Sequence, residues 1–131
     1  MTDKELMQQF EALTLSPESF SHREHVRLAW TYLREYPALT ALSRFCEGLK
    51  RFAASVGKPD RYHETITWAY LLLIHERMAK SATSQPWETF AEANSDLLNW
   101  ESNILKQYYR EETLQSDLAK RVFLFPDREN A

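Results

Sequence analysis

Prolines divide this chain into pieces of helical length, and this division constrains the fold more than any other feature. Pro17, Pro37, Pro59 and Pro86 fall between segments whose apolar residues recur about every 3.6 positions. A residue before a proline avoids the helical region of the backbone, so each proline predicts a helix boundary. The expected helices cover approximately residues 3–13, 21–36, 38–55, 61–80, 87–91, 97–108 and 116–123.

The fold class follows from these segments and from the scarcity of glycine. None of the segments alternates for long between apolar and polar residues, and the chain has only two glycines, Gly48 and Gly57, where a barrel or sandwich would need many tight turns. The 131 residues are 44% hydrophobic, which is enough for one core without disulfides. We expect an all-α, compact single-domain bundle of about five to seven helices that spans residues 1–131.

Charge and composition exclude several classes of function. The net charge of −3 offers no basic field for nucleic acid. No apolar run approaches the roughly 20 residues that span a bilayer, and the polar N-terminus does not resemble a signal peptide. A single cysteine, Cys46, excludes an internal disulfide and a thiolate-rich zinc site, and is expected to be a small core residue. We expect a cytoplasmic protein whose partner is a small-molecule ligand or substrate, with no nucleic acid and no membrane. Exposed aromatic residues would allow a homodimer.

Two histidines lie on the apolar side of the second expected helix. Ser21 and Glu24 form a capping-box pattern that opens this helix. At about 100° per residue, its polar side carries arginines and glutamates, while His22 and His25 fall one turn apart on the opposite side with Ala29. Imidazoles on that side point toward the core and need hydrogen-bond partners or a ligand there.

A third histidine opens the fourth expected helix. The middle of this helix, residues 68–74, is apolar all round, which is typical of a central helix. Its first turns are polar instead: His63 and Thr67 lie one turn apart, and Glu64 lies beside them. His75 lies about 18 Å further along the helix and off this face, so we expect it to be outside any site.

Three inward-facing imidazoles predict a metal centre. Residues at i and i+3 reach one ion, so His22 and His25 would be two ligands and His63 a third, with Glu24 or Glu64 available as a carboxylate. Three protein ligands and an open position are typical of a catalytic site. A cluster of nitrogen and oxygen ligands without thiolate suits a divalent transition metal such as zinc, iron, copper or manganese, and the spacing does not choose among them.

Polar groups near these imidazoles are the candidate catalytic residues of a small-molecule enzyme. Glu64 would be a fourth ligand, a partner that fixes an imidazole tautomer, or a general base. Tyr62 and Thr67 would orient the substrate or a bound water.

Two other functions are consistent with the same residues. In the first, the site is metal-free, and the positive ends of the two helices hold an anionic small ligand, with Tyr62, Thr65 and Thr67 as hydrogen-bond partners. In the second, the histidines are structural and the chain is a helical adaptor for another protein.

The same residues carry a resemblance to known proteins. Phe20-Ser21-His22-Arg23-Glu24-His25, followed by Leu28-Ala29-Trp30, and then Tyr62-His63-Glu64-Thr65-Ile66-Thr67 resemble a group of small bacterial helical proteins of unassigned function. The resemblance continues through Tyr108-Tyr109 and Phe125-Pro126-Asp127. It implies that His22, His25 and His63 belong to a recurring pattern, without implying an activity. The architecture is also similar to that of DinB-like four-helix metalloproteins, whose histidine spacing differs.

Overall fold

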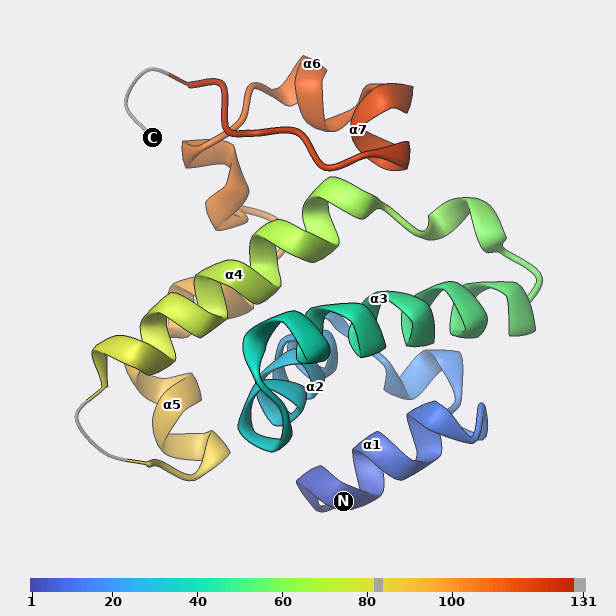
Figure 1. The fold of residues 1–131 in the computed structure, drawn as a ribbon, viewed down its shortest axis with the longest axis vertical. Helices are drawn as coiled ribbons and strands as arrows, with labels where there is room; N and C mark the ends of the chain where they lie inside the picture. Colours follow the sequence, from blue (N-terminus) through green and yellow to red (C-terminus); the bar gives the residue numbers. More distant parts are fainter. Residues whose placement is uncertain (82–83, 129–131) are drawn as a thin grey trace.

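The computed structural model describes residues 1–81 and 84–128, which form α-helices joined by short 3₁₀ turns (Figure 1). The described residues contain seven α-helices, which confirms the all-α prediction. These are α1 (Asp3–Glu11), α2 (His22–Glu35), α3 (Ala38–Ser55), α4 (Glu64–Lys80), α5 (Trp87–Ala93), α6 (Glu111–Leu114) and α7 (Asp117–Arg121). The 3₁₀ turns are η1 (Pro17–Ser19), η2 (Pro59–Arg61), η3 (Ser95–Leu98) and η4 (Ile104–Gln107).

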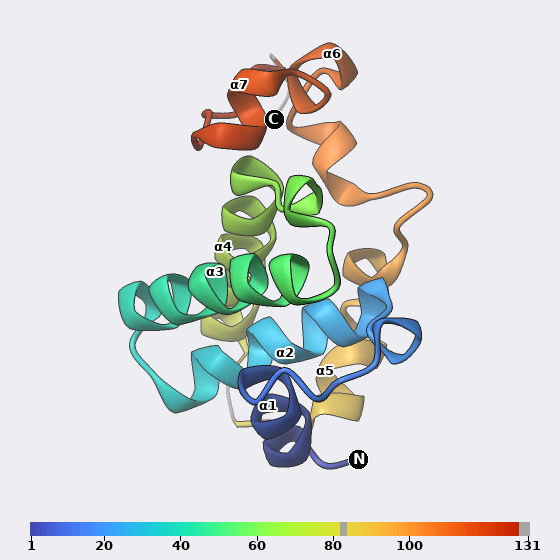
Figure 2. The same ribbon diagram turned by 90° about the vertical axis from the view of Figure 1, so that its right-hand side faces the viewer.

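Helix α4 occupies the centre of the molecule, as its apolar sequence predicts. It packs against α2 and α3 on one side and against η4 and α7 on the other (Figures 1 and 2). Helix α1 lies at one end of the long axis, and α6 and α7 lie at the opposite end. Leu71 and Ile74 of α4 are fully buried, because neighbours cover the helix on both sides.

Helix α1 packs closely against α3 because α3 has a glycine at the crossing. A Cβ at Gly48 would lie 2.4 Å from Cε2 of Phe10, which is too close for a carbon contact. Phe10 is itself fully buried and cannot move aside cheaply. The missing side chain therefore explains how this aromatic ring enters the core between α1, α2 and α3.

The C-terminal segment is tied to the first turn of α4 by buried hydrogen bonds. The Thr65 hydroxyl lies 2.7 Å from the Ala119 carbonyl and 2.8 Å from that of Val122, and it accepts the Leu124 amide at 3.1 Å. The hydroxyl of Tyr109 donates to the Leu124 carbonyl at 2.7 Å. The bonds of Thr65 hold the C-terminal segment against the first turns of α4, which is the end of the helix where the predicted site lies.

Two local predictions are wrong. The helix expected over 97–108 is replaced by η3 and η4, because Asn99 and Asn103 bond to nearby backbone and compete with helical pairing. Ser21 has the backbone of a helix N-cap, but its hydroxyl makes no cap bond. A capping box is found at α1, where Thr2 and Glu5 bond to each other's backbone amides.

Candidate functional site

A cavity of about 480 Å³ lies between α2, α3 and α4, and it contains all three predicted histidines. Its walls are mostly apolar, because each helix presents residues one turn apart along its inner face. The apolar lining residues are Pro17, Phe20, Val26, Ala29, Phe45, Leu49, Phe52, Ala53, Val56, Ile66, Ile74 and Trp100. The remaining lining residues are His22, His25, Arg61, Tyr62, His63, Thr67 and Tyr70.

The imidazole of His63 is bonded to the backbone through both ring nitrogens. His63 is the N-cap of α4, where its Nδ1 accepts the Ile66 amide at 3.1 Å. Its Nε2 lies 2.7 Å from the Leu114 carbonyl, and because a carbonyl only accepts, Nε2 carries the proton. The ring therefore caps a helix and holds the C-terminal segment, which leaves neither nitrogen with a lone pair for another partner.

His22 uses one ring nitrogen and leaves the other open. Its Nε2 donates to the Leu97 carbonyl at 2.9 Å, so in the neutral ring Nδ1 is a hydrogen-bond acceptor. Burial lowers the pKa of His22, and the bond to the carbonyl of Leu97 offsets part of this effect. The ring packs edge-on against Tyr70, with centroids 4.9 Å apart, and tilted against Trp100 at 5.1 Å.

The imidazole of His25 makes no side-chain hydrogen bond with the residues that the structure describes. It stacks on Phe20, with ring centroids 3.8 Å apart and planes 16° from parallel. Burial, together with the positive charge that a protonated His22 would carry, lowers the pKa of His25 to about 4. His25 is therefore neutral near pH 7 and offers one donor and one acceptor at the cavity wall.

The three-histidine metal centre predicted from the sequence is wrong. No group of three or more His, Cys, Asp or Glu side chains in residues 1–81 and 84–128 is placed to hold a metal ion. The physical reason lies in the hydrogen bonds of the imidazoles: His63 has no free lone pair, so only Nδ1 of His22 and one nitrogen of His25 remain, which is fewer than three ligands. Whether the chain takes a divalent transition metal elsewhere stays a prediction.

The three predicted catalytic residues are placed differently from one another. Tyr62 and Thr67 line the cavity, whereas Glu64 does not. The hydroxyl of Tyr62 donates to Glu64, which also accepts the indole N–H of Trp68 at 3.1 Å. Thr67 donates to the His63 carbonyl at 2.7 Å. Each hydroxyl thus already has a protein partner, and an enzymatic role for these residues stays a prediction.

Sequence reasoning missed two lining residues that matter chemically. Arg61 is exposed at the edge of the cavity, at the end of η2. The hydroxyl of Tyr70 is buried and has no hydrogen-bond partner among the described residues. Arg61 was expected inside a helix, and Tyr70 was part of an apolar run, so neither had a sequence signal. His75 is exposed and Cys46 is buried, as expected.

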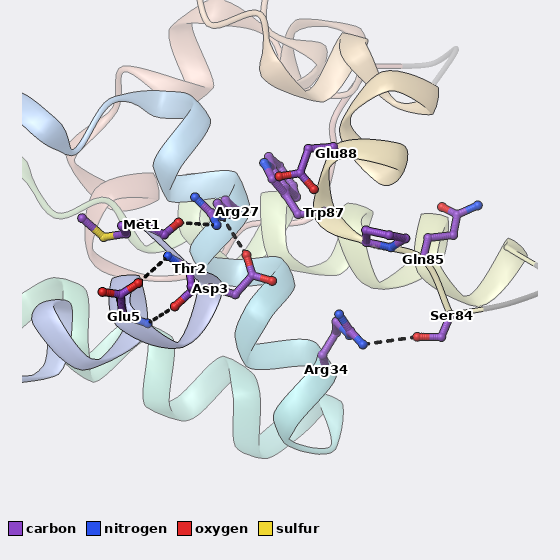
Figure 3. A pocket seen from close by; sticks show the side chains of 11 residues that line it. Met1, Thr2, Asp3, Glu5, Arg27, Arg34, Ser84, Gln85, Trp87 and Glu88 are labelled. Carbon is purple, nitrogen blue, oxygen red and sulfur yellow. Dashed lines mark hydrogen bonds and ion pairs between the residues drawn. The ribbon is translucent and has the colours of Figure 1, made fainter.

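A second hollow, of about 770 Å³, lies on the surface between the N-terminus, α2 and the residues before α5 (Figure 3). Several of its polar groups bond to one another. Arg27 donates to Asp3 and to the Met1 carbonyl, each at 2.8 Å, and Arg34 donates to Ser84 at 3.3 Å (Figure 3). It lacks the apolar walls of the cavity between α2, α3 and α4, which is therefore the better candidate site.

Comparisons with known proteins do not assign the chain to a family. No family model, curated protein or solved structure matches the chain. The resemblance to small bacterial helical proteins therefore stays a prediction. None of the helices in the described residues is long and apolar enough to cross a membrane.

Proposed function

We propose that the chain binds a small, largely apolar molecule in the cavity between α2, α3 and α4, without a metal in the histidine cluster. The observation that carries this proposal is the buried hydroxyl of Tyr70, a residue that lines the cavity, which has no hydrogen-bond partner among the described residues. A buried polar group without a partner is costly, so such groups mark places where a ligand or water binds.

The shape and lining of the cavity support the same proposal. Its volume of about 480 Å³ is within the range of small-molecule sites, which are mostly apolar with a few placed polar groups. The ligand's apolar body would pack on the rings of Phe20, which precedes α2, and of Phe45 and Phe52 in α3. A donor on the ligand would bond to Nδ1 of His22, and an acceptor would bond to the ring N–H of His25.

In the anion-binding alternative, the ligand would be held at the positive ends of the two helices. At the start of α4, the amide of Ile66 is already taken by His63, so this helix end has one amide fewer to offer an anion. The adaptor alternative stays a prediction, as does the cytoplasmic location.

Filling the cavity tests the proposal. Ala53 lines the cavity, whereas its neighbour Ala54 is exposed, so the two positions form a matched pair on α3. Calorimetric titration with decanol should show binding to the wild type and to Ala54→Phe, and about tenfold weaker binding to Ala53→Phe, which fills the space. Far-ultraviolet circular dichroism checks that both variants fold. Failure of decanol to bind, or equal affinities in the two variants, would overturn the proposal.

A further inference from the structure

We infer that the ligand of this cavity is a monocarboxylate whose negative charge pairs with Arg61. This inference rests on the proposed function and adds the chemical class of the ligand. Among the described residues that line the cavity, Arg61 is the one with a permanent charge, and the lining includes no Asp or Glu. A cavity with apolar walls and one cation at its edge matches an apolar molecule with one negative charge.

The guanidinium of Arg61 is available for such a charge. Its side chain makes no ion pair or hydrogen bond with the described residues. By contrast, Arg27 pairs with Asp3 at 2.8 Å and Arg77 pairs with Asp96 at 2.8 Å. Arg61 differs from these two because no carboxylate of the described residues pairs with it.

The backbone holds Arg61 at the cavity edge. Its amide donates to the Lys58 carbonyl at 3.0 Å within η2, which packs on the C-terminal half of α3. The neighbouring charges of Lys58 and Asp60 are opposite in sign, so Arg61 supplies the net positive charge of this turn.

The chemistry of the site favours a carboxylate over other charged groups. A guanidinium presents planar, forked donors that match a carboxylate in bidentate geometry. His22 and His25 have lowered pKa values and are neutral near pH 7, so they add no second cation for a doubly charged phosphate. An ammonium group would meet only like charge at Arg61.

A charge series with one apolar tail tests this inference on the full chain. Calorimetric titrations at neutral pH would use decanoate, decanol and decylammonium, each below its micelle concentration. Decanoate should bind about fivefold more tightly than decanol, because the pair with an exposed arginine is worth a modest amount. Decylammonium should bind most weakly.

Three arginine variants test whether Arg61 causes this difference in affinity. Arg61→Ala should abolish the advantage of decanoate over decanol, and Arg61→Lys should keep part of it. Arg51→Ala, an exposed arginine of α3 that does not line the cavity, should keep all of it. Equal binding of decanoate and decanol to the wild type, or loss of the advantage in both Arg61→Ala and Arg51→Ala, would overturn the carboxylate inference and leave the proposed function standing. If none of the three compounds binds, the proposed function itself fails.

Discussion

At the start of α4, both ring nitrogens of His63 are bonded to backbone, whereas at the start of α2 the ring of His25 makes no such bond with the described residues. Both side chains line one cavity; His63 is the N-cap of α4, and His25 lies in the first turn of α2. The first has a structural role that can be named atom by atom. The second lines the cavity and makes no hydrogen bond with the described residues, so a ligand can bond to its ring nitrogens.

The largest expected effect of this difference is on stability at acid pH. The folded state holds the pKa of His25 at about 4, below the 6.5 of an ordinary imidazole. As pH falls through this window, the unfolded chain takes up a proton that the folded chain does not, so stability decreases. The loss should reach about 3 kcal/mol, and the lowered pKa of His22 adds in the same direction.

Urea unfolding across this pH window measures the effect. His25→Phe keeps an aromatic ring against Phe20 and removes the titrating group, so its stability should depend less steeply on pH. An unchanged pH dependence in His25→Phe would show that His25 is not buried as described.

The next largest effect is expected at the structural imidazole. His63→Ala removes the cap of Ile66 and leaves the Leu114 carbonyl without its donor, so it should destabilise the fold by about 2 kcal/mol at neutral pH. Amides of the C-terminal segment should exchange faster as well. The control is His75→Ala on the same helix, whose exposed side chain should change stability little. Equal effects of the two substitutions would refute the capping role.

A smaller effect separates two buried tyrosines. The Tyr70 hydroxyl has no partner among the described residues, whereas that of Tyr109 donates to Leu124 at 2.7 Å. Tyr70→Phe should leave stability unchanged or raise it by up to about 1 kcal/mol, and Tyr109→Phe should lower it by about 1 kcal/mol. Thermal unfolding compares the two. A loss in Tyr70→Phe as large as that in Tyr109→Phe would mean that the hydroxyl of Tyr70 has a partner.

The sequence predicts the fold class and the inward direction of the histidines, because both follow from local periodicity and from proline positions. The extents of α2 and α3 agree with the expected segments within one residue at each end. The bonding of the imidazoles has no local signal. His63 meets a carbonyl 51 residues away and His22 one 75 residues away, and backbone carbonyls are the same in every residue. The sequence alone therefore does not distinguish a histidine that binds a metal from one that caps a helix.

The position of Arg61 at the cavity edge could not be predicted from the sequence either. An arginine in a charged stretch is usually a solvated surface residue, and only the packing of η2 on α3 places this one at the cavity edge. The helix expected over 97–108 is absent for a local reason that the sequence does contain, since the side chains of Asn99 and Asn103 compete for backbone hydrogen bonds.

The most direct test of the contrast between the imidazoles is a long-range ¹H–¹⁵N NMR spectrum of the histidine rings at neutral pH, recorded without and with decanol. It should show His63 fixed with its proton on Nε2 in both samples, while nitrogens of His22 or His25 shift as decanol binds. If the His63 nitrogens shift as much as those of His22 and His25, or if decanol binds without moving the resonances of His22 or His25, the account is contradicted.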